Sequence, residues 1–366
     1  MIEKPIKMIG SKYAFLLFGF LLFCAALPAQ DSLRVEPDAE PVSESPNGLE
    51  ISGFVDAYYQ YHFQKNAFPT SFTEVHDAFT PGMANIVFAQ KTGAVSFMAD
   101  LAVGPRAETA NGYNGTTLAL IKQLFVTYAP TDNLTFTLGN FGTFIGYELI
   151  DAPANLNYST SYLFSNGPFY HTGLKAELAL SDHWGFMAGV FNDTDRKIDE
   201  VPGKHIGAQL SFSNDNLSAY LNYLGGKDDD SVADHAVFGH QWDLTASYAL
   251  SDKWGLGLNA TMKMVAPAGA ENQYWGGVAT YVNYTFSEIF TLAFRGEWVS
   301  DKDGLILDLP GDEITSLTLS GNIHAGPLCI IPEIRVDHTS RDAFSDAGEQ
   351  PTDKSAAFLV GVVYAF

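Results

Sequence analysis

Cysteine and positive charge are both scarce in this chain of 366 residues. It has only two cysteines, so it can form at most one internal disulfide and no disulfide framework. Its 20 lysines and arginines face 42 aspartates and glutamates, which leaves a formal net charge of −22. A chain that binds nucleic acid needs a basic surface, and this composition therefore excludes nucleic acid as a partner.

Long apolar runs are also missing, except near the N-terminus. The run 13–27 is about 15 residues long and is broken only by small side chains, which is short for a membrane-spanning helix. Lysines precede this run and Ala29 follows it, which is the three-part pattern of a secretory signal. We expect residues 1–29 to be a signal peptide cleaved after Ala29, and cleavage after Ala26 stays open. Residues 30–49 are acidic and rich in proline, and we expect a disordered periplasmic leader there.

The rest of the chain alternates apolar and polar residues with the period of a β-strand. In 206–212, 241–250 and 290–298 most residues at every second position are apolar, and the residues between them are mostly polar or small. Seven tight-turn signals recur along the chain, and most of them lie about 36 residues apart, an interval that fits two strands, one tight turn and one longer loop. They are marked by Gly93, Asp132, Asp182, Asp215, Asp252, Glu288 and Gly326.

Seven tight turns join fourteen strands, and an opening strand near 50–62 and a closing strand at 356–366 bring the expected number to about sixteen. The charged fraction is only 17%, which suits a wall that faces lipid on one side and water on the other. We therefore predict an all-β fold, a transmembrane antiparallel up-and-down β-barrel over residues 50–366. A secreted β-sandwich or β-helix would explain the alternation but not the evenly paired segments.

The closing strand ends in aromatic residues, as do the terminal strands of Gram-negative outer-membrane barrels. One face of this strand carries Phe358, Val360, Val362, Tyr364 and Phe366. We predict that Tyr364 and Phe366 form the signal that the barrel-assembly machinery reads after periplasmic chaperones deliver the chain. The expected location is the outer membrane of a Gram-negative bacterium, with membrane lipid and lipopolysaccharide as partners.

One connection, at about 141–170, is much longer than its neighbours and lies between the fifth and sixth predicted strands. It is rich in aromatic residues, which would be poorly placed in a solvated loop. We predict that this third external loop folds into the barrel and narrows the pore. A lid across the mouth of the barrel, or additional edge strands, stays open as the alternative.

Several short motifs resemble those of a known family. They are Gly53-Phe54-Val55-Asp56-Ala57-Tyr58-Tyr59, the stretch from Gly139-Asn140-Phe141 to Glu148, Asn157-Tyr158-Ser159 and His171-Thr172-Gly173. Over residues 50–366 the chain resembles the OmpL-like family of outer-membrane β-barrel porins. The resemblance implies an outer-membrane channel, and it assigns no catalytic residue to this sequence.

Charges on the polar strand faces are expected to line the lumen, because a charge on the lipid face costs about 2–4 kcal/mol at the membrane midplane. They are Asp56, Asp100, Lys175, Glu177, Asp243, Lys263, Arg295, Glu297, Glu333, Arg335 and Asp337. The predicted constriction holds Tyr147, Glu148 and Asp151, with Arg295 and Arg335 opposite. Because carboxylates predominate, we predict a weakly cation-selective pore. The alternative is that these charges pair across neighbouring strands and only hydrate the wall.

Motifs for catalysis and cofactor binding are absent from the sequence. It contains no H-E-x-x-H, no G-x-S-x-G, no phosphate-binding Gly-Lys loop and no cysteine pair for a metal. We therefore predict a passive channel for small hydrophilic solutes, with no enzymatic step, cofactor or metal. A structural or adhesive barrel with a plugged lumen stays open, as does a hydrolase whose triad meets only in the fold, with His171 and His205 as candidates. The sequence also leaves open whether barrels form homotrimers.

Overall fold

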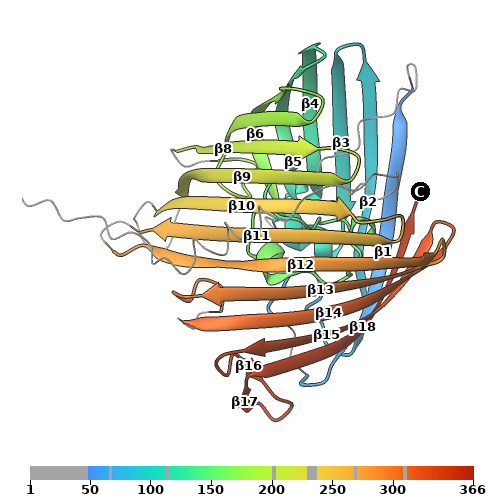
Figure 1. Ribbon diagram of the computed structural model, residues 1–366, viewed down its shortest axis with the longest axis vertical. Coiled ribbons are helices and arrows are strands. Elements are labelled where there is room, and N and C mark those ends of the chain that lie inside the picture. The colour runs from blue at the N-terminus through green and yellow to red at the C-terminus, as the bar shows by residue number, and fades with distance from the viewer. Residues whose placement is uncertain are drawn as a thin grey trace, which may run out of the picture.

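The computed structural model describes residues 48–65, 68–112, 116–199, 203–228, 237–267, 270–307 and 311–366. Within these residues, sixteen antiparallel strands close into a barrel in which the first strand pairs with the last (Figure 1). The predicted fold class is therefore confirmed. The predicted signal peptide with its cleavage site at Ala29, and the leader up to residue 47, lie outside the described residues.

Each barrel strand hydrogen-bonds to the strands before and after it around the wall. The strands are β1 (Glu50–His62), β2 (Ala78–Thr92), β3 (Val95–Val103), β4 (Ile121–Thr131), β5 (Leu134–Gly142), β6 (Tyr170–Ala179), β7 (Trp184–Phe191), β8 (His205–Ser213), β9 (Leu217–Asp228), β10 (Val237–Ala249), β11 (Trp254–Ala266), β12 (Gln273–Ser287), β13 (Phe290–Asp301), β14 (Asp312–Ala325), β15 (Leu328–Thr339) and β18 (Lys354–Ala365). A separate two-stranded hairpin of β16 (Phe344–Ser345) and β17 (Pro351–Thr352) lies in the connection between β15 and β18.

All seven tight-turn signals of the sequence fall between consecutive strands of the barrel. Gly93 and Gly326 adopt φ angles of 61° and 62°, a left-handed conformation that glycine reaches at little cost. In the Ser-Asp turns the serine makes the hydrogen bonds: the Oγ atoms of Ser181 and Ser251 accept backbone N–H groups two and three residues ahead. The turn is thus stabilised by the serine hydroxyl rather than by the aspartate that follows it.

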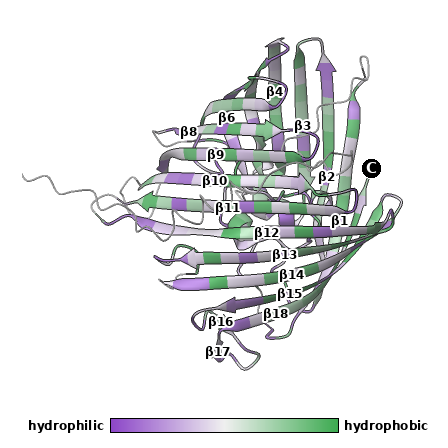
Figure 2. Ribbon diagram, in the orientation of Figure 1, coloured by the Kyte–Doolittle hydropathy of each residue, from purple (hydrophilic) through white to green (hydrophobic). Residues whose placement is uncertain are grey.

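Hydrophobic and hydrophilic residues alternate along many of the strands (Figure 2), and on strands such as β13 and β18 burial alternates with the same period. On β13, Phe294 and Trp298 are 38% and 39% exposed, whereas the intervening Arg295 and Glu297 are buried inside. The C-terminal residue completes the ring, because the backbone of Phe366 exchanges two hydrogen bonds with that of Gly53 at 2.9 and 3.0 Å. The aromatic face of the closing strand, including Tyr364, points outward.

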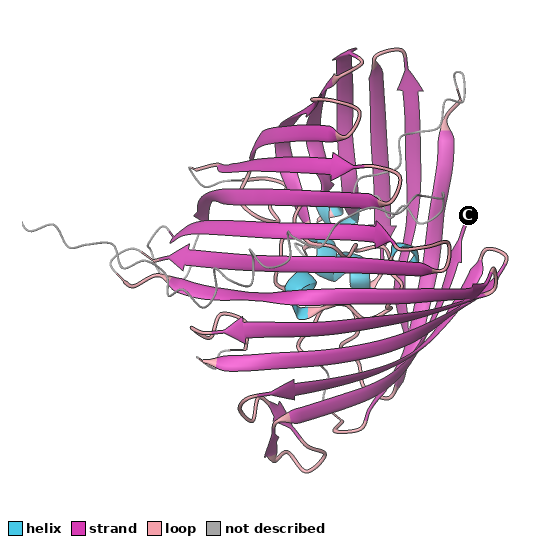
Figure 3. Ribbon diagram, viewed as in Figure 1, coloured by secondary structure: helices cyan, strands magenta, loops and turns pink. Residues whose placement is uncertain are grey.

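The helical segments are short and lie within the ring of strands (Figure 3). They are the α-helices α2 (Pro105–Asn111) and α3 (Tyr162–Ser165) and the 3₁₀ turns η1 (Thr117–Leu120) and η2 (Ala152–Ala154). In the described part of the chain, none of the helices has the length and apolar character needed to cross a membrane.

Candidate functional site in the barrel lumen

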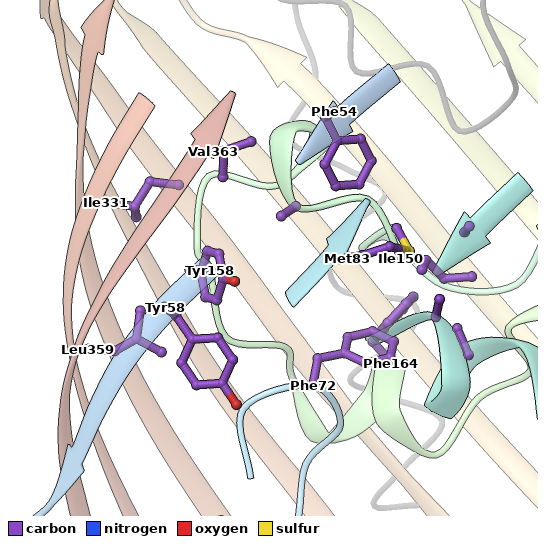
Figure 4. Close-up of a cluster of buried hydrophobic side chains, with 14 residues drawn as sticks. Phe54, Tyr58, Phe72, Met83, Ile150, Tyr158, Phe164, Ile331, Leu359 and Val363 are labelled. Carbon is purple, nitrogen blue, oxygen red and sulfur yellow. The ribbon is translucent and has the colours of Figure 1, made fainter. Parts of the chain in front are cut away.

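The connection from β5 to β6, residues 143–169, lies inside the barrel and is called the inner loop below. Its Tyr158 and Phe164 belong to an apolar cluster with Tyr58 of β1 and with Phe72 from the β1–β2 connection (Figure 4). Helix α3 within the loop packs against a second cluster on β12, β13 and β14. Most aromatic residues of the loop are therefore buried against the wall and against neighbouring connections, and Tyr147 and Phe169 are half-buried.

Two wall carboxylates hold the backbone of the inner loop. Glu333 on β15 accepts the N–H groups of residues 158 and 159, at 2.7 and 3.1 Å. Glu297 on β13 accepts those of residues 162 and 163, at 2.9 and 2.8 Å. Neither carboxylate has a lysine or arginine among its hydrogen-bond partners in the described residues. A carboxylate that accepts two amide hydrogens is a strong, charge-assisted anchor for a loop.

Arg295 is completely buried and ties the inner loop to β13. Its guanidinium donates to Glu148 Oε1 at 2.6 Å and to the carbonyl oxygen of Ser159 at 2.6 Å. The sequence placed Arg295 opposite the predicted constriction residues Glu148 and Asp151, and in the structure its guanidinium is in direct contact with Glu148. The other oxygen of Glu148 accepts the N–H of Ser161 at 2.7 Å, so this carboxylate also braces the loop from within.

Arg335 is equally buried and acts two strands away, on β15. Its Nε and Nη2 atoms donate to the two carboxylate oxygens of Asp337, each at 2.9 Å, and its Nη1 atom donates to the carbonyl oxygen of Thr160 at 2.9 Å. Asp337 in turn accepts the hydroxyl of Tyr162 at 2.6 Å. Arg335 is thus paired with its own strand and with the loop.

Asp151 pairs with a residue that the sequence did not single out. Lys122 on β4 lies 2.7 Å from Asp151 and 2.5 Å from Asp100 on β3, so one ammonium bridges the loop and the wall. Asp100 also accepts the amide of Asn85 at 3.0 Å. Lys122 lies in the 118–128 segment, where alternation is irregular, and the register needed to place it in the lumen is not readable from that segment.

Asp56 on β1 anchors the loop near its middle by accepting the hydroxyl of Tyr158. Arg106 of α2 lies 3.8 Å from Asp56 and stacks between the rings of Phe72 and Tyr158, 4.7 and 5.0 Å from their centres. Arg106 also donates to the carbonyl oxygen of Ile150. Stacking of a guanidinium on two rings joins three connections inside one barrel.

The other predicted lumen residues make fewer contacts with the inner loop. Lys175 and Glu177 pair with each other along β6 at 3.0 Å, and Lys263 on β11 is partly exposed. Tyr147 stacks on Tyr281 of β12 with ring centres 4.3 Å apart. Asp243 on β10 belongs to a different arrangement, a polar row on neighbouring strands.

This polar row runs across four adjacent strands, β8 to β11. Gln209 donates to Asn222 at 2.9 Å, and Asn222 and Asn259 donate to Asp243 at 2.9 and 2.6 Å. The N–H of Gly146 in the inner loop completes the set at 3.0 Å from Asp243. The carboxylate of Asp243 is therefore surrounded by uncharged donors. The alternation of the sequence places these side chains on one face, but the cross-strand register that joins them appears only in the fold.

The C-terminal end of the inner loop is held by the β7–β8 connection. Asp195 accepts the N–H groups of Phe169 and Tyr170 at 2.8 and 3.0 Å. Burial raises the pKa of the Asp195 carboxyl to about 6, against the opposing effect of these two hydrogen bonds. Lys197 of the same connection lies 4.1 Å from the centre of the Tyr170 ring. The described residues contain no cluster of three or more His, Cys, Asp and Glu side chains suited to a metal ion.

A family model described as "Putative beta-barrel porin-2, OmpL-like" matches residues 48–366. The chain belongs to this family. The match covers the whole described barrel, and it confirms the resemblance that the short motifs indicated. A comparison with curated proteins finds no match.

Solved structures of outer-membrane proteins share the fold of this chain at low sequence identity. An anion-selective porin from Comamonas acidovorans is 13% identical, with 87% of this chain and 99% of that chain covered and a TM-score of 0.62. The outer membrane channel DcaP of Acinetobacter baumannii is 14% identical, with 87% of this chain and 97% of that chain covered and a TM-score of 0.58. OmpT of Vibrio cholerae is 11% identical, with 87% of this chain and 97% of that chain covered and a TM-score of 0.57. At these identities the likeness extends to the fold alone.

Proposed function

We propose that this OmpL-like porin is a passive diffusion channel for small hydrophilic solutes in the outer membrane of a Gram-negative bacterium. The observation that carries the proposal is a closed sixteen-strand barrel whose strands carry many buried charged and polar side chains on their inward faces and whose third long connection lies in the lumen. A barrel of this size encloses an aqueous channel unless it is filled, so a loop inside it controls the passage. Passive passage needs no bond-making step and no cofactor.

We further propose a weak preference for cations. Asp243, Glu297 and Glu333 accept hydrogen bonds from uncharged donors in the lumen, whereas the lumen arginines each contact a carboxylate. The lumen therefore carries more negative than positive charge when these groups are ionised, which raises the local concentration of cations. Burial of the same carboxylates limits the size of the effect.

A second candidate is a structural barrel with a closed lumen. It is favoured by the packed apolar clusters that surround the inner loop and by the many hydrogen bonds that fix it. The same arrangement suits a channel with a narrow remaining passage, and the family match supports the channel. A current measurement separates the two candidates.

The location and partners follow from the same proposal. Residues 1–29 would direct export and be removed after Ala29, and Tyr364 and Phe366 would be read by the barrel-assembly machinery after periplasmic chaperones release the chain. The outward aromatic side chains would contact membrane lipid and lipopolysaccharide. Association into homotrimers is a further proposal, tested by cross-linking of the folded protein in native membranes.

The experiment is a current recording of the purified protein in a planar bilayer, with a tenfold gradient of potassium chloride. We expect stable current steps and a reversal potential on the cation side of zero. A reversal potential on the anion side contradicts the charge argument. A protein that is folded, as judged by a heat-dependent shift in electrophoretic mobility, but carries no current contradicts the channel and supports the closed barrel.

A further inference from the structure

The inner loop is attached unevenly to the barrel wall. Its ionic and carboxylate anchors lie on β13, β15, β1 and, through Lys122, on β3 and β4. On β8 to β11 the hydrogen bonds that the described residues make to the loop are those of Gly146 to Asp243 and of Ser247 to Tyr147, the latter at 3.3 Å. By hydrogen bonds and ion pairs the loop is therefore fixed mainly to one side of the lumen, whereas on the other side Phe144, Ile145 and Tyr147 lie against β8, β9 and β11 with few polar contacts.

Burial of the inward side chains follows the same division. On the anchored side, the inward residues of β13, β14, β15, β18 and β1 are almost fully covered. Their exposed fractions are 0% for Arg295, 1% for Thr318, 2% for Arg335, 2% for Leu359 and 2% for Asp56. On β8 to β11 the middle of the wall is equally covered, with Asn222, Asp243 and Asn259 each 1% exposed, but Gln209, Ser211, Ser247 and Lys263 stay partly exposed inside the barrel. Water therefore reaches the lumen at these four positions of the second wall.

This second wall is lined mainly by uncharged polar groups. The row of Gln209, Asn222 and Asn259 surrounds Asp243, which is only 1% exposed and accepts hydrogen bonds from three of its neighbours. Below the row, toward the tight turns, the inward side chains include the hydroxyls of residues 211, 220 and 247. Amide and hydroxyl groups both donate and accept hydrogen bonds, so they can replace the hydration of a solute that carries the same groups.

We propose that solutes cross the barrel along the wall of β8 to β11, past residues 144–147 of the inner loop, and that this passage selects uncharged solutes rich in hydroxyl or amide groups, such as polyols and small sugars. The inference rests on the proposed channel and names its path and its solute class. An ion loses part of its hydration in a narrow passage, and this wall offers it few accessible charges, because Asp243 is buried and Lys263 is a single partly exposed cation. A polyol loses hydroxyl–water hydrogen bonds and regains equivalent ones from the partly exposed amide of Gln209 and the hydroxyls of Ser211 and Ser247.

The path is tested by modifying cysteines in a chain whose Cys24 and Cys329 are replaced by serine. Ser211→Cys and Ser247→Cys lie on the proposed path, and Ser316→Cys and Ser355→Cys are matched inward positions on the opposite wall, 0% and 1% exposed. We expect a charged methanethiosulfonate to reduce the current of the first pair by about half or more and to leave the second pair unchanged. Block at the second pair, or no block at the first, overturns the path.

The solute class is tested with vesicles that contain the wild-type protein. Uptake of a neutral pentitol is compared with that of an aldonate and an amino sugar of the same carbon number. We expect the pentitol to enter about tenfold faster than either charged solute, because a charge costs more to desolvate than a hydroxyl. Equal uptake, or faster uptake of a charged solute, by a protein that conducts overturns this inference alone. A protein that neither conducts nor takes up any solute overturns the proposed channel.

Discussion

The ion pair between Arg295 and Glu148 gives the sharpest prediction for the inner loop. Both side chains are buried, at 0% and 5% exposure, and the guanidinium also donates to the carbonyl oxygen of Ser159. The substitution Arg295→Met keeps the apolar length of the side chain and removes all of these donors. It leaves the Glu148 carboxylate buried without its cation.

Removing one partner of a buried ion pair costs about 3–5 kcal/mol, because the remaining charge is desolvated and unpaired. The inner loop can detach from β13 without unfolding the barrel, so the cost appears first as easier local opening. We expect amide hydrogens of residues 158–163 in Arg295→Met to exchange about a hundredfold faster or more than in the wild type. The double variant Arg295→Met with Glu148→Leu removes both charges, and it should recover at least half of the lost protection.

Hydrogen exchange followed by mass spectrometry on the detergent-solubilised barrel measures this effect directly. Lys263→Met is the matched control, because it removes a partly exposed lumen cation on β11 that is not paired with Glu148. Unchanged exchange in Arg295→Met would refute the anchoring role of this residue. A double variant as unprotected as the single one would show that the Ser159 contact, and not the buried charge, carries the effect.

Two further substitutions test the contacts that close the barrel and seat the loop. A methyl group on Gly361 of β18 would lie 2.3 Å from the ring of Tyr158, so Gly361→Ala should displace that ring and destabilise the inner loop by about 1–3 kcal/mol, measured by exchange of its amides. Gly142→Ala is the control, since its methyl group would meet no atom closer than 3.7 Å. Equal changes of amide exchange in Gly361→Ala and Gly142→Ala would argue against close packing of Tyr158 on β18. Phe366→Ala should lower the fraction of heat-modifiable, assembled barrel in the outer membrane several-fold, whereas Phe286→Ala, a similarly exposed aromatic residue, should not; equal yields would remove Phe366 from the assembly signal.

The barrel itself was predictable because its signals are local. Turn residues such as Ser181 and Ser251 and the period-2 pattern between them act within a few residues of sequence, and they define where each strand begins and ends. The inward direction of Glu297 and Arg295 follows from the same alternation, because a charge is costly in lipid. These features need no knowledge of the distant partner.

The partners of the lumen charges were not predictable, because they depend on the path of the inner loop through the barrel. The sequence gives Glu333 an inward position but does not show that it accepts the amides of residues 158 and 159. Lys122 was missed for a related reason: its strand has an irregular pattern and a register shift between Asp100 and Leu101 in its pairing with β3. Long-range pairing of this kind is fixed by packing and not by local propensity.

The central claim is that the inner loop narrows a solute passage through the barrel. Because Gly142 and Tyr170 are paired neighbours at the ends of β5 and β6, a short glycine-serine linker can replace residues 144–168 without stretching the wall. The decisive measurement is the single-channel conductance of the wild type and of this shortened chain, recorded side by side in the same bilayer and salt. We predict that both conduct and that the shortened barrel carries about threefold more current or greater, since an unfilled sixteen-strand barrel encloses a wide aqueous channel. Equal conductance of the two folded proteins would contradict the claim.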